Sequence, residues 1–303
     1  MTDATTIDDA RDFTSIFPPL GVAQYNGGRD NTTLTNNTVS TEKSRTKVSI
    51  IIPVYNQEKQ ITDLLTRIRK ILKPIFTDYE LVVVNDGSID NTLAALRKEQ
   101  EELKSKVRVI SYGENRGKGY AVKQGVIQSS GDIVLFIDGD LEISPEAINN
   151  YVTELKYYDL VIASKAHHFS DVVSPTSRKV LSKMFNLLVR VALGIRLKDT
   201  QSGMKAGKGS VLRAIFRTML VNRYAFDVEM LVIASLFHLT IKEMPVKVII
   251  NKRFKLREIV RMAMDVAAIT YRLKINHCYY KIALDMYMSS LKMQPYVQTE
   301  ILH

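Results

Sequence analysis

The sequence predicts an α/β fold, with a mostly parallel sheet and helices on both of its faces. The first observation is a nearly continuous run of β-branched residues at 48–54 (VSIIIPV), which is typical of a strand covered on both faces. The second is that similar runs alternate with helical patterns further along the chain. Strands and helices in alternation imply right-handed crossovers, and therefore parallel strands. The third is that no repeat of fixed period is present, which excludes a solenoid.

The elements after the first strand can be placed in order from their periodicity. A helix follows, because apolar residues recur at helical spacing at Ile61, Leu64, Leu65, Ile68 and Leu72. Residues 81–84 predict a second buried strand. The pattern then predicts a charged helix at about 90–103, a strand at 107–111, a helix at about 119–129 and a strand at 133–137.

The composition is that of a globular protein with an anionic partner. The 303 residues are 46% hydrophobic and 24% charged, which excludes a disordered, collagenous or fibrous chain. The single cysteine, Cys278, excludes an internal disulfide and favours a reducing compartment. Forty-two Lys and Arg against 32 Asp and Glu give a net charge of +10. This excess favours a nucleic acid, a phosphorylated substrate or an anionic membrane surface.

The chain divides into three parts. Residues 1–46 are polar and lack a sustained period, so we expect a mobile tail without a catalytic role. Residues 47–251 contain the alternating strands and helices, and 252–303 form a basic, helical C-terminal region. Neither a transmembrane helix nor a cleaved signal is predicted, because apolar stretches are interrupted by charge and the first residues are acidic.

Acidic side chains follow several of the predicted strands. Asp86 and Asp90 come after the second strand, and Asp138, Asp140 and Glu142 follow the fourth. Ligands of such sheets bind at the carboxyl ends of the strands, and paired carboxylates suit a hard divalent cation that grips a diphosphate. Two alternatives remain: Asp138-Gly139-Asp140 is also common turn chemistry, and Asp90 is also a suitable cap for the next helix.

A basic, glycine-containing turn precedes the helix expected at 119–129. Residues 113–119 (GENRGKG) match neither a P-loop nor a dinucleotide fingerprint, because their glycine spacing fits neither pattern. A cationic turn at a helix N-terminus suits a diphosphate, and the alternative is a solvated loop.

In combination these segments resemble a known family. Residues 53–58 (PVYNQE), 84–90 (VNDGSID), 116–119 (RGKG) and 138–140 (DGD) resemble the inverting, A-type nucleotide-sugar glycosyltransferases of family two. Residues 163–165 (ASK), 198–205 (KDTQSGMK) and 224–229 (YAFDVE) are similar to the dolichyl-phosphate β-glucosyltransferase branch, a relative of the dolichyl-phosphate mannose synthases. The chain departs from this branch at Gly139, at Tyr224 and at 253–255 (RFK).

The resemblance implies a fold, an activity and a set of site residues. The fold would be the A-type, Rossmann-like sheet at 47–251 with C-terminal amphipathic helices. The activity would be inverting transfer of a hexose, favouring glucose from UDP-glucose, to dolichyl or polyprenyl phosphate as a lipid-linked donor for protein N-glycosylation. The implied donor-binding residues are Pro53, Tyr55, Glu58, Asp86, Ser88, Lys118 and Asp138. The implied ligands of Mg²⁺ or Mn²⁺ are Asp138, Asp140 and Glu142.

The acceptor side can be argued from its chemistry. The second pKa of a phosphate monoester is about 6, so this acceptor is an oxyanion at neutral pH and needs positioning cations instead of a general base. Lys165, Arg178 and Lys255 are the candidates. Asp140 and Asp227 are the candidate catalytic residues, although Asp227 opens a predicted apolar helix and also suits the helix dipole.

The C-terminal region predicts contact with a membrane. Cations exceed acids by seven between Lys242 and Lys281. An apolar helical stripe runs through Ile259, Met262, Val266, Ile269 and Leu273. Its flanking cations include Arg257, Arg261, Arg272 and Lys274. Such a stripe suits the headgroups of an anionic leaflet, and its alternative is a helix packed on its own domain. We therefore expect a peripheral enzyme on the cytoplasmic face of a membrane.

Other functions stay open at this stage. A mannose synthase that uses GDP-mannose, a soluble family-two enzyme with a non-lipid acceptor, and a non-enzymatic sugar-nucleotide-binding module would share the nucleotide motifs. A nucleic-acid binder would explain the charge but not the carboxylates at the strand ends. The sequence indicates neither the oligomeric state nor the length of the polyprenol.

Overall fold

The computed structural model of the chain describes residues 46–103, 106–139, 142–195, 197–249 and 256–282. All but the last residue of the predicted tail at 1–46 lies outside this range, as do Asp140 and Lys255.

A seven-stranded sheet forms the centre of the fold, with the strand order β3-β2-β1-β4-β7-β5-β8. Its strands are β1 (Val48–Val54), β2 (Tyr79–Asp86), β3 (Val107–Tyr112), β4 (Ile133–Phe136), β5 (Leu160–Ala163), β7 (Lys205–Lys208) and β8 (Ile241–Met244). All neighbours pair in parallel except β7, which is antiparallel to β4 and β5. A second, parallel pair joins β6 (Asp171–Val173) to β9 (Lys247–Ile249). The predicted mostly parallel sheet is confirmed.

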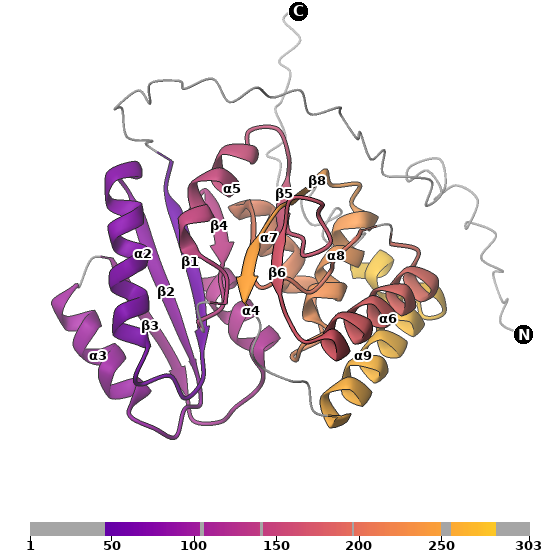
Figure 1. Cartoon of the computed structure of the whole chain (residues 1–303), viewed down its shortest axis with the longest axis horizontal. Coiled ribbons are helices and arrows are strands. Elements are labelled where there is room, and N and C mark those ends of the chain that lie inside the picture. Colours follow the sequence, from indigo (N-terminus) through magenta and orange to yellow (C-terminus); the bar gives the residue numbers. More distant parts are fainter. Residues whose placement is uncertain (1–45, 104–105, 140–141, 196, 250–255, 283–303) are drawn as a thin grey trace, which may run out of the picture. The chain divides into compact units, whose positions relative to one another are not determined.

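Helices cover both faces of this sheet (Figure 1). They are α2 (Ile61–Ile75), α3 (Thr92–Glu102), α4 (Lys118–Gln128), α5 (Ile148–Glu154), α6 (Thr176–Leu193), α7 (Gly209–Thr218), α8 (Phe226–Leu236) and α9 (Leu256–Lys274), with a short 3₁₀ turn at Pro145–Ala147. Each element predicted between residues 48 and 137 is present, and its ends differ from the prediction by a few residues.

Alternate residues of β1 explain the two layers of helices. Successive side chains of a strand point to opposite faces, and every residue of β1 is buried. Ile50 and Ile52 belong to one apolar core with residues of α2, α3 and α5. Ile51 belongs to the other, with residues of α4, α6, α7, α8 and α9. This is why the run at 48–54 is apolar at nearly every position.

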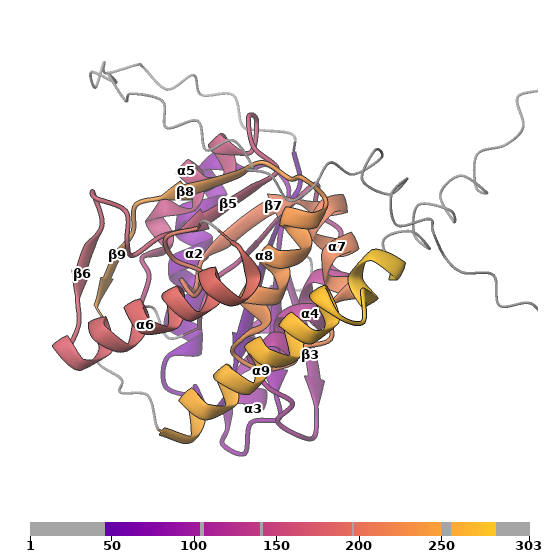
Figure 2. The same cartoon turned by 90° about the vertical axis from the view of Figure 1, so that its right-hand side faces the viewer.

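Helix α9 packs on the domain through the stripe that was singled out in the sequence. Met262, Val266, Ile269 and Leu273 are buried in the core that also includes residues of α6 and α8. The stripe therefore packs on the protein itself, which was the alternative to membrane contact. Figure 2 shows α9 running beside α6. Within the described part of the chain, each helix is too short or too polar to cross a bilayer.

Candidate active site

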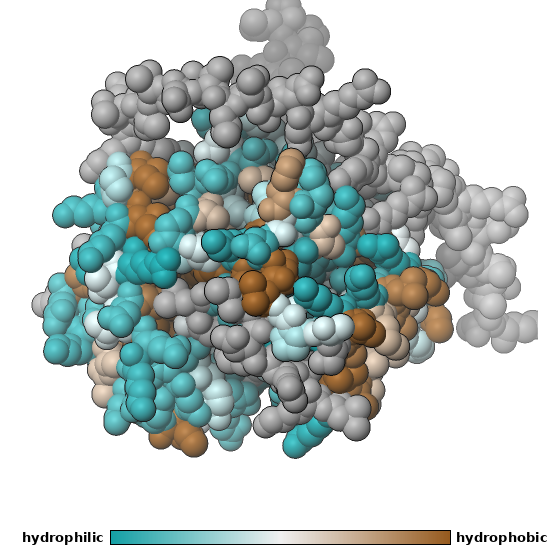
Figure 3. Space-filling view, viewed as in Figure 1, coloured by the Kyte–Doolittle hydropathy of each residue, from teal (hydrophilic) through white to brown (hydrophobic). Residues whose placement is uncertain are grey.

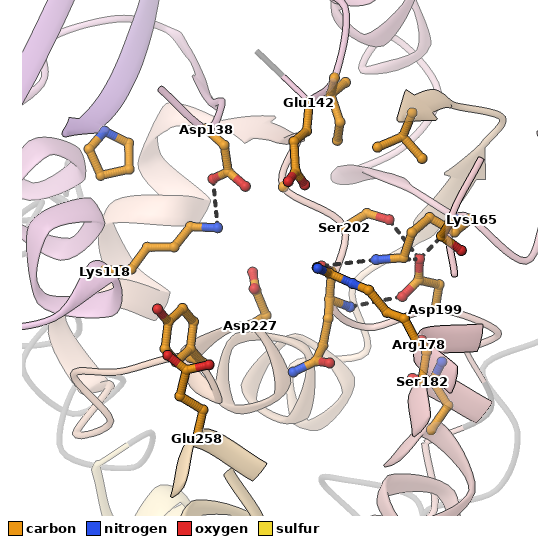
Figure 4. A pocket seen from close by; sticks show the side chains of 18 of the residues that line it. Lys118, Asp138, Glu142, Lys165, Arg178, Ser182, Asp199, Ser202, Asp227 and Glu258 are labelled. Carbon is orange, nitrogen blue, oxygen red and sulfur yellow. Dashed lines mark hydrogen bonds and ion pairs between the residues drawn. The ribbon is translucent and has the colours of Figure 1, made fainter. Parts of the chain in front are cut away.

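A cleft of about 1250 Å³ opens at the carboxyl ends of β1, β2 and β4. Its walls also include the start of α4, one side of α6, the start of α8 and residues 198–203. Figure 4 shows side chains from these separate segments pointing into a common space. This is the edge of the sheet at which the sequence predicted a ligand.

Asp86 organises the basic turn at one end of the cleft. The Asp86 carboxylate is almost fully buried and accepts hydrogen bonds from the Tyr112 hydroxyl (2.7 Å) and from the backbone N–H groups of Arg116 (2.9 Å) and Gly117 (3.0 Å). Gly117 has φ +104°, a conformation that favours glycine, and a Cβ there would lie 2.7 Å from the Asn222 carbonyl oxygen. The turn is thus fixed directly before the first residue of α4, Lys118.

Of the other residues predicted to bind the donor nucleotide, Pro53 and Tyr55 line the cleft. Glu58 and Ser88 are not among the lining residues and instead connect the loops after β1 and β2: the Asn91 N–H donates to the Glu58 carboxylate at 2.7 Å, and the Asn56 N–H donates to the Ser88 hydroxyl at 2.9 Å. Direct contact of Glu58 and Ser88 with a nucleotide stays a prediction.

The Asp90 carboxylate accepts the backbone N–H of Thr92, the first residue of α3, at 3.0 Å. Asp90 therefore supports the start of this helix, which was the alternative to a ligand contact.

Two of the three predicted metal ligands can be placed. Asp138 and Glu142 both line the cleft, and Figure 4 shows their carboxylates pointing toward the same space. A Cβ at Gly203 would clash with the Asp138 carboxylate, so a glycine leaves room for it. Carboxylate oxygens are the ligands that Mg²⁺ and Mn²⁺ prefer, so this pair fits the predicted ion. Among the described side chains no set of three acidic, His or Cys ligands gathers, and Asp140 lies outside them.

Lys118 lies across from these acids. Its ammonium is 2.6 Å from the Asp138 carboxylate, and both side chains remain partly exposed in the cleft. A cation beside two carboxylates gives this end of the cleft both signs of charge. That combination suits a diphosphate with a divalent cation.

A buried ion pair lies in the floor of the cleft. The Lys205 ammonium, on β7, is 2.6 Å from the Asp227 carboxylate at the start of α8 and donates to the Ser202 carbonyl oxygen at 2.6 Å. Burial lowers the pKa of Lys205 and raises the pKa of Asp227, and their mutual attraction opposes both shifts. Sequence reasoning missed Lys205, because a lysine within a short motif gives no sign that it is fully buried.

The other end of the cleft is cationic. Lys165 follows β5, and its ammonium is 3.4 Å from the Asp199 carboxylate and donates to the Gln201 carbonyl oxygen at 3.2 Å. Burial raises the pKa of Asp199, but Lys165 and hydrogen bonds from Ser202 and two backbone N–H groups outweigh it, and the net pKa lies below its usual value. Asp199 therefore stays ionised and holds Lys165 at the cleft.

One side of α6 adds further cations to this end. Arg178 lines the cleft, and Figure 4 shows its side chain reaching toward Lys165 and Asp199. Lys179, Lys183, Arg190 and Lys198 line it as well. Lys179, Lys183 and Arg190 lie on α6, and Lys198 lies in the segment after it. The roles of these four were not predicted, because the helical spacing of the first three shows that they share a side of α6 but not what that side faces, and the position of Lys198 after the helix gives no sign of what it lies near.

Comparison with known proteins fits this geometry. The family description "Glycosyl transferase family 2" matches residues 49–216, which is more than half of the chain. The chain belongs to glycosyltransferase family 2. The resemblance drawn from the strand-end motifs is thereby confirmed, and the protein is a glycosyltransferase.

Two relatives carry more specific names. A dolichyl-phosphate beta-glucosyltransferase of Drosophila melanogaster is 34% identical over 220 residues, which is 66% of each chain. One of Trichomonas vaginalis is 31% identical over 242 residues, 75% of this chain and 71% of the relative.

The fold also matches a solved structure. Glucosyl-3-phosphoglycerate synthase from Mycobacterium tuberculosis, in complex with Mn²⁺, UDP-glucose and phosphoglyceric acid, superimposes with a TM-score of 0.56 at 22% identity. The match covers 75% of this chain and 79% of the other. It confirms the predicted A-type fold.

Proposed function

We propose that this glycosyltransferase transfers glucose from UDP-glucose to a polyprenyl phosphate, with inversion at C1 and with Mg²⁺ or Mn²⁺. The observation that carries the proposal is the division of one cleft into two ends. Asp138, Glu142 and Lys118 suit a metal-bound diphosphate at one end, and Lys165 and Arg178 suit a second phosphate at the other. The names of the relatives support the polyprenyl acceptor.

The donor lies at the carboxylate end in this proposal. Pro53 and Tyr55 would flank the nucleoside, and Lys118 would face the diphosphate. Asp138 and Glu142, with Asp140, would hold the metal, which when bound neutralises charge that develops on the leaving diphosphate. A cleft of about 1250 Å³ exceeds the volume of a typical single-ligand pocket, roughly 300–1,000 Å³, and so has room for both substrates.

The acceptor phosphate lies at the cationic end. One of its oxygens attacks C1 of the hexose from the side opposite the diphosphate. As the new C1–O bond forms, the bond from C1 to the diphosphate oxygen breaks, and its electron pair leaves with UDP. A monoester phosphate is largely a dianion at neutral pH, so its attacking oxygen carries no proton that a general base must remove. Lys165 and Arg178 would hold the attacking oxygen in line.

Asp227 is proposed to orient the hexose between these two ends. Figure 4 shows its carboxylate between Lys118 on one side and Arg178 on the other. A carboxylate in this place accepts hydrogen bonds from sugar hydroxyls, and Lys205 compensates the cost of burying its charge.

Incubation with radiolabelled UDP-glucose or GDP-mannose, with and without dolichyl phosphate, followed by organic extraction, tests the proposal. We expect organic-phase label from UDP-glucose only when dolichyl phosphate is present. Label from GDP-mannose alone would identify a mannose synthase. Label that stays in the aqueous phase on a new product would identify a soluble acceptor. The absence of any product with either donor would favour a sugar-nucleotide-binding module that is not an enzyme.

A polyprenyl phosphate does not leave the bilayer, so the proposal places the enzyme at a membrane surface. We propose peripheral attachment on the cytoplasmic face. The excess of seven positive charges between Lys242 and Lys281 supports attraction to an anionic leaflet.

A further inference from the structure

Two neighbouring helices of the fold carry exposed apolar side chains. Of the sixteen large hydrophobic residues that are exposed in the described part of the chain, nine lie on α6, on α9 or directly after α9. We call eight of them the docking face: Val180, Met184, Leu187 and Val191 on α6, and Val260, Met264, Tyr271 and Ile275 on or after α9. Their concentration on two adjacent helices distinguishes them from single exposed hydrophobics, which are common on protein surfaces.

Helix α6 has three different sides. Phe185, Val189 and Leu193 are buried in the core. A second side lines the cleft and carries its cations. The third side is apolar and exposed. Its residues at positions 180, 184, 187 and 191 follow the helical repeat and therefore fall on one stripe. Leu187 belongs both to this stripe and to the cleft lining, so the stripe is continuous with the cationic end of the cleft.

Helix α9 is apolar on two opposite sides. Met262, Val266 and Ile269 pack into the core, whereas Met264 and Tyr271 lie on the other side with 66% and 54% of their surface exposed. A helix that is apolar on both sides is normally covered on both. Helices α6 and α9 lie side by side (Figure 2) and bury their inner sides in the same core. Their exposed stripes lie opposite these inner sides and therefore point away from that core together.

The charges around the docking face indicate which kind of partner it binds. Helix α6 contains four cations and no acid. Helix α9 contains two acids and four cations, of which Arg272 pairs with Glu229 inside the protein and the other three are available to the surface. Figure 3 shows hydrophobic atoms gathered over this pair of helices beside hydrophilic ones. An apolar stripe bordered by cations complements a leaflet of anionic lipid, where acyl chains take the apolar side chains and headgroups meet the cations.

We propose that the docking face inserts into the interface of an anionic membrane and brings the cationic end of the cleft to the headgroup layer. The inference rests on the proposed function, since a lipid acceptor must enter the cleft from the bilayer. It differs from the expectation drawn from the sequence, because the stripe at 262–273 is buried and the lipid contact falls on the opposite side of α9 and on α6.

Vesicle co-sedimentation of the full chain tests the docking face. The probes are vesicles of phosphatidylcholine with and without phosphatidylserine. Two triple variants each change three side chains outside the cleft lining. One is V180Q/M184Q/V191Q on α6, and the other is V260Q/M264Q/Y271Q on α9. The control, I89Q/Y157Q, replaces two hydrophobic residues that are even more exposed but do not belong to either helix. Val191→Trp tests the opposite direction, because tryptophan favours the membrane interface.

We expect the wild type to bind phosphatidylserine vesicles, each triple variant to bind at least about tenfold more weakly, and the control to bind like the wild type. Val191→Trp should bind more tightly. Triple variants that are folded and bind vesicles like the wild type would overturn the proposal. A wild-type dimer that the triple variants dissociate, with vesicle binding unchanged, would also overturn it and make the face a contact between copies of this chain.

Transfer to a short, water-soluble prenyl phosphate separates this inference from the proposed function. The triple variants should keep wild-type transfer to that acceptor and lose transfer to dolichyl phosphate in vesicles. The wild type could transfer sugar to neither acceptor and still bind vesicles more tightly than the triple variants do. In that case the proposed function fails and the docking face stands. If transfer succeeds and the variants use vesicle-borne acceptor like the wild type, the docking face fails alone.

Discussion

At the scale of single residues, the cleft contains three carboxylates that each pair with a lysine. Asp138 pairs with Lys118, Asp199 with Lys165 and Asp227 with Lys205. The three pairs differ in burial. The first pair is partly exposed, so water screens the attraction between its two charges. Little free energy is therefore lost when Asp138 binds a metal and Lys118 binds a diphosphate instead of each other. The third is buried, so it is a fixed part of the floor.

Asp138→Asn tests the metal site. Loss of one anionic ligand beside the diphosphate should lower kcat by at least about 100-fold while the protein stays folded. The control is Glu146→Gln, which removes a carboxylate from an exposed pair with Arg67. Asp140→Asn should have the same effect as Asp138→Asn. Unchanged turnover of Asp138→Asn, or full wild-type activity in excess chelator, would contradict the assignment.

Lys165→Met and Arg178→Met test the acceptor end. Each should raise the KM for the acceptor or lower kcat on the order of tenfold or more, while the affinity for UDP-glucose, measured by calorimetry, stays near wild type. Asp199→Asn should act in the same direction, because it releases Lys165. Lys208→Met, which removes a cation from an exposed pair with Asp159, serves as the control. A selective loss of nucleotide binding would move these cations to the donor side.

Lys205→Met tests the floor of the cleft through its pH dependence. Burial already raises the pKa of Asp227, and removal of Lys205 removes the attraction that opposes this shift. A larger fraction of the carboxyl should then be protonated at a given pH, so activity should fall and should recover as the pH rises through the higher pKa. Lys205→Arg, which keeps the charge, should restore much of the wild-type profile. A uniform loss without a shift of the acidic limb would indicate a purely structural role for Lys205.

At the scale of elements, local periodicity accounts for the part of the fold that was predicted. Residues 48–137 alternate buried strands and amphipathic helices, and both patterns can be recognised without knowledge of the contacts. The reversed strand β7 and the pair β6 and β9 contain three or four residues each, which is too short for a period to be recognised. Their placement depends on which neighbours complete the sheet.

The same distinction applies to the site. Acids directly after buried strands were predicted, because parallel strands bring their carboxyl ends to one edge. No role was predicted for Lys205, for Asp199 or for the α6 cations other than Arg178, since their function depends on tertiary neighbours. The stripe of α9 illustrates the limit, because its spacing shows an apolar side but not whether protein or lipid covers it.

Helix α9 is held by a buried carboxylate as well as by its apolar side. Glu229 on α8 is fully buried and accepts hydrogen bonds from Arg272 at 3.1 Å, from the Tyr279 hydroxyl and from the backbone N–H groups of Leu220 and Val221. Arg272 was expected among the cations beside a membrane. Its guanidinium instead belongs to this ion pair, so the expectation is corrected.

Arg272→Gln should therefore destabilise the fold. It leaves the buried Glu229 carboxylate without its cation, at a cost of about 2–3 kcal/mol in the free energy of unfolding. Arg257→Gln and Arg261→Gln change cations of the same helix outside this network and should cost less than about 0.5 kcal/mol. Urea unfolding measures all three. Equal stability of Arg272→Gln and its controls would show that the pair does not anchor α9.

At the scale of the whole molecule, the fold joins two halves of the chain at one cleft. The residues proposed for the nucleotide and metal come from β1, β2 and β4 and the loops after them, and the acceptor cations come from the region between β5 and β7. The reversed strand β7 lies between β4 and β5 and carries Lys205 under the junction of the two ends. The central claim is that this arrangement transfers a sugar from a nucleotide to a phosphate.

Transfer of label from UDP-glucose to dolichyl phosphate, compared with dolichol in the same detergent, tests that claim most directly. Both acceptors have the same apolar chain, so a difference between them isolates the phosphate that the cationic end is proposed to hold. We expect organic-phase label with dolichyl phosphate and a divalent cation, at least about 100-fold less with dolichol, and a β-linked product. Equal labelling of dolichol, or an α-linked product, would contradict the account.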